Sequence, residues 1–502
     1  MRYLLKSLLM KHSIYLLNIN CTPDYFKKMR ILNLKFYSTK RILVSTLLTL
    51  LCFNTFAQAW TEVGTGTNAL KATGSVASLL IDVSGNIYAA GGFIDGNLNT
   101  YVAKWNGTSW SELGTGSNAL INSGSFNTIE SIAADNSGNI YAAGEFININ
   151  GKQYVAKWNG TNWTELGFGT NALNANANIY SILVDHIGNV YAAGDFTNSG
   201  NSRYVAKWDG TSWSELGTGA NALNANATIY KIALDASGNI YAGGYFTDGN
   251  GKEYIAKWDG TNWTELGTGT NALNADNFVS SIAIDASGNV YAAGRFSDSV
   301  IYSLGNEYVA KWDGTNWTKV GTGTNAIFNG IIRSLINDNA GNLYIAGDFL
   351  NTSAKEYVAK WDGGSWSEVG TGTNALNAND LIETVALDGS GNLYAGGFFT
   401  DATFHKYVAK YGMTSGVANV PGSVNIICIS PNPASNSVAI SLNKQFASAE
   451  IYITDLIGRE IYHSNISNLK HTIDVSTWSN GLYICDLKID GKKSSAKIVI
   501  NR

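Results

Sequence analysis

One position in a repeated phrase varies freely between the copies, and it is the first candidate for a chemical role. The chain has 502 residues and repeats the phrase S-G-N-[IVL]-Y-A-A-G-x-F, in which the residue before the phenylalanine varies. In the seven copies this residue is Gly92, Glu145, Asp195, Tyr245, Arg295, Asp348 and Phe398. Glu145 and Asp195 belong to successive copies, and a carboxylate pair roughly 5–10 Å apart is what glycoside hydrolysis requires. Simple exposure explains the same scatter, because surface positions vary without a function.

Other signals of catalysis are missing from the sequence. Four histidines follow residue 59; none has metal-ligand spacing, and no two share a repeat. The motifs G-x-S-x-G and H-E-x-x-H and paired cysteines are absent as well. We therefore expect no catalytic residue, metal site or cofactor. The side chains at the variable position are predicted to form a ligand-binding surface instead: Glu145, Asp195, Tyr245, Arg295, Asp348 and Phe398.

The elements that carry this position follow from the period of the repeat. The phrase begins at intervals of about 50 residues, at Ser84, Ser137, Ile187, Ser237, Ser287, Ala340 and Ser390. Y-V-A-K-W and W-[ST]-E-[LV]-G recur in step with it. Each copy holds four short runs rich in β-branched and aromatic residues; in the fifth they are 281–285 (A), 289–296 (B), 307–312 (C) and 317–321 (D). Repeats of this length built from four strands predict a β-propeller.

The order of the runs predicts how the ring closes. The repeat region opens with a D strand, Trp60–Gly64, and ends with a C strand, Tyr407–Tyr411. Pairing these two strands completes the last blade and removes both exposed sheet edges. The sequence therefore predicts an all-β protein with a seven-bladed β-propeller over residues 60–416, closed by its N-terminal D strand.

Strand direction predicts the face on which a ligand would bind. The A–B and C–D turns share one face, and they are nearly identical in all copies. The B–C loops and D–A links share the other face, which holds most of the variation, including a longer fifth loop (297–307) and an insertion at 121–130. The variable position lies near this second face, where loops on a rigid scaffold usually bind ligands.

The remaining recurrent residues are predicted to be structural. Thirteen of the 14 tryptophans open D strands or end C strands, which indicates packing between blades. The aspartate that opens each A–B turn, such as Asp235, is predicted to cap the turn. The C-strand lysines, such as Lys257, are predicted to pair with D-strand glutamates or to face solvent.

The N-terminal region has the features of a signal peptide. Residues 1–59 carry nine Lys or Arg and the single acid Asp24. An apolar run, Ile42–Phe56, precedes Ala57-Gln58-Ala59, a small-x-small cleavage site. The basic segment before Met29 is longer than a signal peptide needs, so Met29 is a second candidate for the start. No other apolar run reaches about 20 residues, and we expect no transmembrane segment after cleavage.

A second domain follows a linker at 417–424. Residues 425–502 alternate short strands with Gly and Asn turns, which predicts a small β-sandwich. They contain a P-N-P-A element, a D-x-x-G-R turn and a G-x-Y strand in that order. The motif residues are Pro431, Asn432 and Pro433, then Gly458 and Arg459, then Gly481 and Tyr483. This region resembles the type A C-terminal sorting domain of the type IX secretion system of Bacteroidota. The resemblance implies export across both membranes, the secretion machinery as a partner, and a location at the cell surface or in the medium.

Cysteine and charge add two constraints. Only Cys428 and Cys485 follow residue 59, and a disulfide and a pair of buried thiols both fit their predicted strands. The net charge is −4 although residues 1–59 are basic, so the remainder is acidic, which excludes nucleic acid and anionic membranes as expected partners.

The propeller repeat itself resembles NHL-type and kelch repeats, families that share a fold and no single activity. We therefore expect an exported, non-catalytic binding module for an extracellular polysaccharide or a surface protein. A polysaccharide hydrolase or lyase and a structural surface-coat protein are the alternatives.

Overall fold

The computed structural model describes residues 58–82, 84–120, 128–297, 307–321, 328–338 and 340–413, and in the C-terminal part 427–430, 434, 436–442, 449–455, 459–468, 470–489 and 492–500. The chain divides into two compact units, Met1–Ser415 and Gly416–Arg502, and each is described by itself. The predicted signal peptide up to residue 57 and the predicted linker lie outside the described residues, as do most of the longer fifth loop and of the insertion at 121–130.

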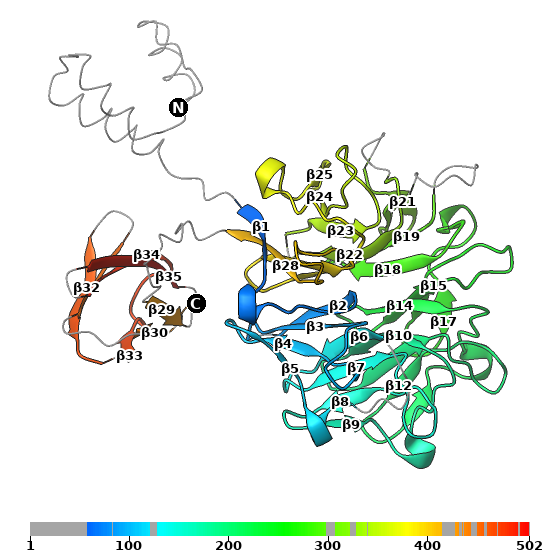
Figure 1. Ribbon diagram of the computed structural model, residues 1–502. Coiled ribbons are helices and arrows are strands. Elements are labelled where there is room, and N and C mark those ends of the chain that lie inside the picture. Colours follow the sequence, from blue (N-terminus) through cyan, green and yellow to red (C-terminus); the bar gives the residue numbers. More distant parts are fainter. Residues whose placement is uncertain are drawn as a thin grey trace, which may run out of the picture. The chain divides into compact units, whose positions relative to one another are not determined.

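The first unit is built from seven four-stranded antiparallel sheets, which confirms the seven predicted blades (Figure 1). The A strands are β2 Val76–Ile81, β6 Ile129–Ala134, β10 Ile179–Val184, β14 Ile229–Leu234, β18 Val279–Ile284, β22 Ile332–Asn337 and β26 Ile382–Leu387. The B strands are β3 Ile87–Gly91, β7 Ile140–Gly144, β11 Val190–Gly194, β15 Ile240–Gly244, β19 Val290–Gly294, β23 Leu343–Gly347 and β27 Leu393–Gly397.

The outer half of each blade is formed by the C and D strands. The C strands are β4 Ala103–Trp105, β8 Ala156–Trp158, β12 Ala206–Trp208, β16 Ala256–Trp258, β20 Ala310–Trp312, β24 Ala359–Trp361 and β28 Ala409–Met413. The D strands are β1 Gln58–Glu62, β5 Trp110–Glu112, β9 Trp163–Glu165, β13 Trp213–Glu215, β17 Trp263–Glu265, β21 Trp317–Lys319 and β25 Trp366–Glu368. Short 3₁₀ turns follow D strands at η1 Gly66–Asn68, η2 Gly116–Asn118, η3 Gly169–Asn171, η4 Gly219–Asn221, η5 Gly269–Asn271 and η7 Gly372–Asn374.

The ring closes as predicted, through the N-terminal strand. β1 pairs with β28, with Trp60 opposite Tyr411, and β2 contacts β26 of the last blade; Figure 1 shows the blue β1 beside the gold β28. β1 begins at Gln58 rather than at Trp60, because Gln58 and Ala59 continue the ladder opposite Met413 and Gly412. The innermost A strands contact one another in sequence around the ring.

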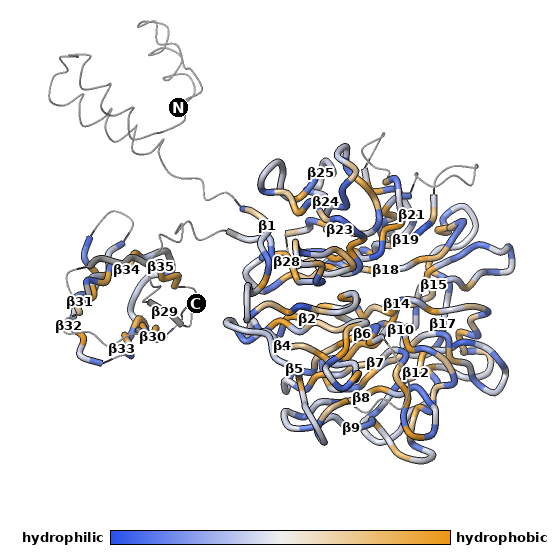
Figure 2. Tube along the Cα trace, viewed as in Figure 1, coloured by the Kyte–Doolittle hydropathy of each residue, from blue (hydrophilic) through white to orange (hydrophobic). Residues whose placement is uncertain are grey.

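Hydrophobic residues fill the space between neighbouring blades. The B strands are buried throughout, and the phenylalanine after each one is fully buried, as in Phe196 and Phe246. One core cluster joins Val63 and Phe93 of the start of the chain to Tyr394 and Val408 of its last blade. Figure 2 shows the hydrophobic residues following the strands, with hydrophilic residues in the connections.

Tryptophan side chains tie each blade to the one before it, which confirms the predicted packing role. The indole Nε1 of each D-strand tryptophan donates to the carbonyl of the residue that follows the preceding D strand; Trp263 reaches the Leu216 oxygen at 2.7 Å. The same bond closes the ring, from Trp60 Nε1 to the Val369 oxygen at 2.8 Å.

The turn aspartates also act as predicted. Asp235 Oδ1 accepts from the backbone N–H groups of Ser237 and Asn239, and its Oδ2 accepts from the Asn239 amide and the Tyr241 hydroxyl. These bonds hold the pKa of the Asp235 carboxyl below its usual value, against the opposing effect of burial.

The C-strand lysines are half-buried and have an aromatic partner that the prediction did not include. Lys257 lies over the ring of Tyr241, 5.6 Å from its centroid, and six other C-strand lysines do the same over their own B-strand tyrosines. The reason is register: Tyr241 and Lys257 are directly opposed on neighbouring strands, which brings the ammonium group over the aromatic face.

The second unit is a small sandwich of two antiparallel sheets, as predicted. One sheet holds β29 Ile427–Ser430, β30 Ser437–Leu442 and β33 Lys470–Asp474; the other holds β31 Ala449–Asp455, β32 Glu460–Ile466, β34 Gly481–Ile489 and β35 Lys492–Ile500. Both contribute to one core, which includes Ile440, Ile453 and Leu487. Cys485 is a free thiol in this core, where burial raises its pKa to about 12; the side chain of Cys428 lies outside the described residues.

Candidate ligand-binding site at the channel mouth

Every A strand carries a β-bulge at its second residue. In β10 the register shifts between Ile179, opposite Gly194, and Ser181, opposite Ala193, so Tyr180 is an extra residue. The same shift occurs at the same place in all seven blades. In a regular strand successive side chains point to opposite faces of the sheet. A bulge interrupts this alternation and changes the direction of the side chain at the extra residue. It places the second and the third residue of the A strand on the channel side.

The glycine that ends each B strand makes this bulge possible. A Cβ on Gly194 would overlap the carbonyl oxygen of Asn178, and a Cβ on Gly244 would overlap that of Thr228. The last glycine of the repeated phrase is therefore a steric requirement, because the bulged strand lies directly against it.

The bulge residues surround a cavity of about 300 Å³ at the centre of the ring. They are of five types in the seven blades: Ala77, Glu130, Tyr180, Tyr230, Ser280, Arg333 and Glu383. Six of the seven third A-strand residues, all but Ser181, complete the lining together with Phe278, which precedes β18. A repeated backbone thus presents an asymmetric set of side chains.

Most of the third residues have a structural task. The Ser181 Oγ accepts from the backbone N–H of Ile232 in the next blade at 3.2 Å, and Ser78, Ser131, Ser281 and Ser334 accept in the same way. Lys231 departs from this pattern. Burial lowers the pKa of its ammonium group, so its cationic form is less favoured than in water.

The acidic residues of the lining are strongly perturbed. Burial, with smaller contributions from Glu145 and Glu383, raises the pKa of Glu130 from 4.5 to about 7. Burial also raises the pKa of Glu383, while Arg333 lowers it. Carboxyl groups with such shifts in a cavity mark candidate functional sites.

The predicted site residues lie beside this cavity, and none of the six lines it. The backbone N–H of Glu145 donates to the Thr128 carbonyl just before β6, and Asp195, Tyr245, Arg295, Asp348 and Phe398 make the equivalent bond. The variable position therefore lies next to the start of each A strand. Tyr245 is 48% exposed.

Several of the six interact with residues of the lining. Tyr245 packs on Phe278 with ring centroids 6.1 Å apart. Asp348 pairs with Arg333 at 3.5 Å, and Glu145 raises the pKa of Glu130.

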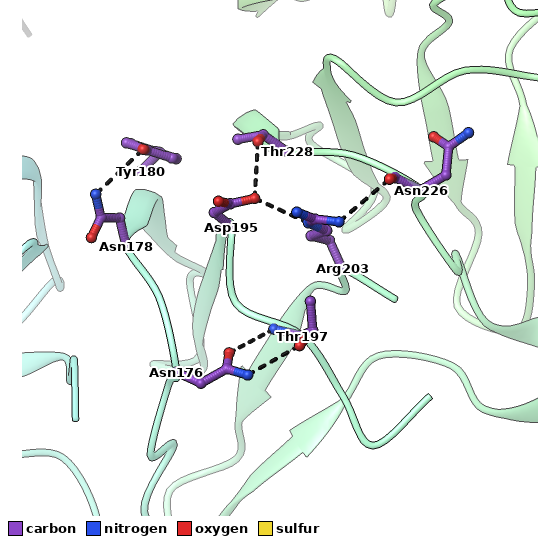
Figure 3. A network of polar contacts seen from close by, with 8 residues as sticks. All are labelled: Asn176, Asn178, Tyr180, Asp195, Thr197, Arg203, Asn226 and Thr228. Atoms are coloured by element: carbon purple, nitrogen blue, oxygen red, sulfur yellow. Dashed lines mark hydrogen bonds and ion pairs between the residues drawn. The ribbon is translucent and has the colours of Figure 1, made fainter. Parts of the chain in front are cut away.

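Asp195 and Glu145 are held by structural hydrogen bonds. Figure 3 shows Asp195 Oδ1 accepting from Arg203 Nε and from the Thr228 hydroxyl, both at 3.0 Å. Glu145 accepts from the backbone N–H of Thr128 at 3.3 Å and from the Asn178 amide at 3.2 Å. Asn178 also donates to the Tyr180 hydroxyl at 3.4 Å. These carboxylates fix the links between blades.

Sequence reasoning missed the bulge residues because strict alternation assigns only one of two successive residues to each face. Their signal was present, since this A-strand position holds five residue types in seven copies, against six at the position that was chosen.

The sorting-domain residues are partly described. Arg459 donates from Nε to Asp455 Oδ2 at 3.0 Å, and these two residues are the ends of the D-x-x-G-R motif. Tyr483 is buried and donates its hydroxyl to the Ser479 carbonyl at 2.9 Å, and Gly481 has a φ of 155°. Pro431, Asn432, Pro433 and Gly458 lie outside the described residues.

Comparison with known families identifies the C-terminal part. Residues 429–501 match the model of the secretion system C-terminal sorting domain. The protein is thus exported by the type IX secretion system to the cell surface or the medium. In the part of the chain that the structure describes, no helix has the length and apolar character of a membrane span. No sequence match was found among curated proteins.

Solved structures with a related arrangement are distant. One is PorZ, described as an essential bacterial surface component of the type-IX secretion system of Porphyromonas gingivalis, with 16% identity, 86% of this chain covered and a TM-score of 0.47. This chain covers 60% of the length of PorZ. YCF48 bound to D1 peptide shows 12% identity, 71% and 97% coverage and a TM-score of 0.46. A PL25 ulvan lyase shows 13% identity, 71% and 96% coverage and a TM-score of 0.42. At these values no function is transferred to this chain.

Proposed function

We propose that the ring of this exported protein is a non-catalytic binding module, and that its ligand, an extracellular polysaccharide or a surface protein, docks at the channel mouth. One observation carries the proposal. The seven bulges direct side chains of five different types into one cavity, while the surrounding framework is repeated almost unchanged. Pockets with a few convergent polar groups in an apolar frame are the usual binding sites of proteins.

A second candidate is a polysaccharide hydrolase that uses residues of the same cavity. Glu130 and Glu383 are carboxyl groups in unlike environments, with the pKa of Glu130 near 7, and such pairs divide acid and base roles in glycosidases. Asp195 and Glu145 fit this role less well, because hydrogen bonds within the fold already occupy them.

The test uses the full exported chain and two variants of the lining, Arg333→Gln and Glu383→Gln. Glu460→Gln, on an exposed residue of the second unit, is the control. Retention on insoluble polysaccharides or on outer-membrane proteins, without soluble product and weakened only by the lining variants, supports the module. Product release that Glu383→Gln abolishes supports the hydrolase. Retention that neither lining variant changes would contradict a site at the channel mouth.

A further inference from the structure

The lining of the channel mouth has two unlike halves, and this division bears on the chemistry of the ligand. One half is aromatic. Tyr180, Tyr230 and Phe278 come from three successive blades, with ring centroids 5.6 Å and then 5.4 Å apart. Tyr245 extends the series outward. The cavity therefore has a continuous aromatic wall.

The other half is charged and has unused hydrogen-bonding atoms. Arg333 and Glu383 belong to successive blades, and Glu130 lies on β6, beyond the small Ala77. Arg333 Nε and Glu383 Oε2 are shielded from solvent and have no hydrogen-bond partner within the protein. A buried polar atom without a partner costs about 1–3 kcal/mol. Both residues line the cavity, so a ligand toward which their side chains turn these atoms would recover that cost.

The balance of charge excludes strongly ionic ligands. An anion would gain from Arg333 and Lys231, but it would face Glu383, Glu130 and, behind Arg333, Asp348 at 3.5 Å. A cation would gain from the aromatic rings and the carboxylates, yet Arg333 and Lys231 line the same small space. Neither sign of charge is complemented as a whole.

A neutral ligand with one apolar face and several hydroxyl groups satisfies both halves. A pyranose ring presents C–H bonds on one face, which pack against aromatic side chains. Its hydroxyl groups both donate and accept, so one can donate to Glu383 while another accepts from Arg333. The volume of about 300 Å³ is at the lower limit of ordinary ligand pockets and fits one or two such rings.

We infer that the channel mouth binds the end of a neutral glycan chain, with a terminal pyranose ring packed between the Tyr180–Tyr230–Phe278 wall and the polar atoms of Arg333 and Glu383. This inference rests on the proposed function and specifies its ligand. A long stretch of chain does not fit the cavity, so the chain enters end-on and the remainder stays outside the mouth.

The experiment measures the affinity of the full chain, by calorimetry, for matched oligosaccharides that are neutral, uronate-containing, sulfated or amino-substituted. We expect the neutral series to bind with the highest affinity, and the affinity to level off after one or two sugar units. Tyr230→Ala and Glu383→Gln should each weaken binding about tenfold or more, equivalent to about 1.4 kcal/mol. Phe404→Ala is the aromatic control, since Phe404 is 84% exposed and does not line the cavity, and thermal unfolding verifies that each variant folds.

The outcomes separate the two proposals. Preference for a charged series that the lining variants abolish would overturn the neutral-glycan inference and retain the proposed function. So would binding of a surface protein alone, lost in the same variants. Affinity that keeps rising with chain length would overturn end-on binding. If the lining variants bind every ligand as the unmodified chain does, both proposals fail.

Discussion

At the scale of single residues, side chains in nearly identical blades differ in role according to what surrounds them. Asp195 and Glu145 are carboxylates at a freely varying position, and both are engaged in bonds that hold the blades together. Glu130 occupies the bulge, where burial and two other carboxyl groups raise its pKa. The chemistry available to a carboxyl group here depends on its place relative to the channel.

Replacement of Glu130 by Gln should change how stability depends on pH. The folded-state pKa of Glu130 is raised from 4.5 to about 7. Its stabilising contribution is therefore fully present below about pH 4.5 and is lost as pH rises through about 7. Relative to Glu130→Gln, the unmodified chain should lose about 1–3 kcal/mol of unfolding free energy between pH 5 and pH 8, given about 1.4 kcal/mol per pKa unit and partial screening by channel water. Chemical denaturation at several pH values measures this.

The control for that series is Glu460→Gln, on an exposed residue of the second unit. It should leave the pH profile of the ring parallel to that of the unmodified chain. Parallel profiles for Glu130→Gln as well would show that Glu130 ionises normally.

Gly194→Ala should destabilise the ring strongly. The added methyl group would overlap the Asn178 carbonyl oxygen and contact the Ile179 backbone, so the bulge must shift, at an expected cost of about 2–4 kcal/mol. Gly249→Ala is the matched control, because its Cβ would meet open space and the equivalent Ile149 is exposed. Equal melting temperatures for the two variants would contradict the steric requirement at Gly194.

At the scale of elements, the B–C loops and D strands form two kinds of contact. Asn148, Asn198 and Asn351 cap their loops and donate their amide to the D-strand glutamate of the same blade. Asp95, Asp248 and Asp401 stand at the same place in other blades. There the aspartate contributes to raising the pKa of Glu112, Glu265 and Glu62, after burial, which has the larger effect. This contact is therefore less stabilising in the blades that carry an aspartate than in those that carry an asparagine.

Asp248→Asn should stabilise the protein at neutral pH. The asparagine can keep the Oδ1 bonds to the backbone of Asn250 and Lys252 and donate to Glu265, as Asn198 does to Glu215. We expect a gain of about 0.5–1 kcal/mol at pH 7. The gain should shrink as pH falls and Glu265 is protonated, since a raised glutamate pKa costs stability only above it. The reverse change, Asn198→Asp, should destabilise; shifts of the same sign in the two melting curves would be inconsistent with this account.

At the scale of the whole molecule, one pairing joins the two ends of the ring. β1 and β28 are about 350 residues apart in sequence and directly paired in space. Trp60 packs on Tyr411, with ring centroids 5.4 Å apart, and donates to Val369. The other blades form from consecutive segments, so only this blade depends on long-range closure.

Trp60→Ala and Trp263→Ala should therefore differ in their effect on self-association. Each removes an equivalent indole, its bond to a carbonyl and an aromatic contact, at a cost of about 2–4 kcal/mol. Only Trp60→Ala loosens the closing pair and exposes the edge of β28, which favours pairing with another chain. Thermal unfolding should show a similar loss of stability in both variants. Light scattering should show that only Trp60→Ala self-associates. Equal self-association of Trp263→Ala would show that closure has no special role.

The sequence by itself determined the number of blades, the closing strand, the turn caps, the tryptophan contacts and the sorting domain. The features of the ring follow from the repeat period and from turn residues that recur in every repeat. The sorting domain follows from its own motifs. The tertiary structure decided which residues line the channel. A bulge at Tyr180 and its equivalents overrides the two-residue alternation of the A strand, and it depends on close contact between that strand and Gly194 on its neighbour. It also placed Lys257 over Tyr241 through strand register, and it committed Asp195 to Arg203 and Thr228. The sequence separation of these residues does not indicate that their side chains are in contact. Only the tertiary structure shows these contacts.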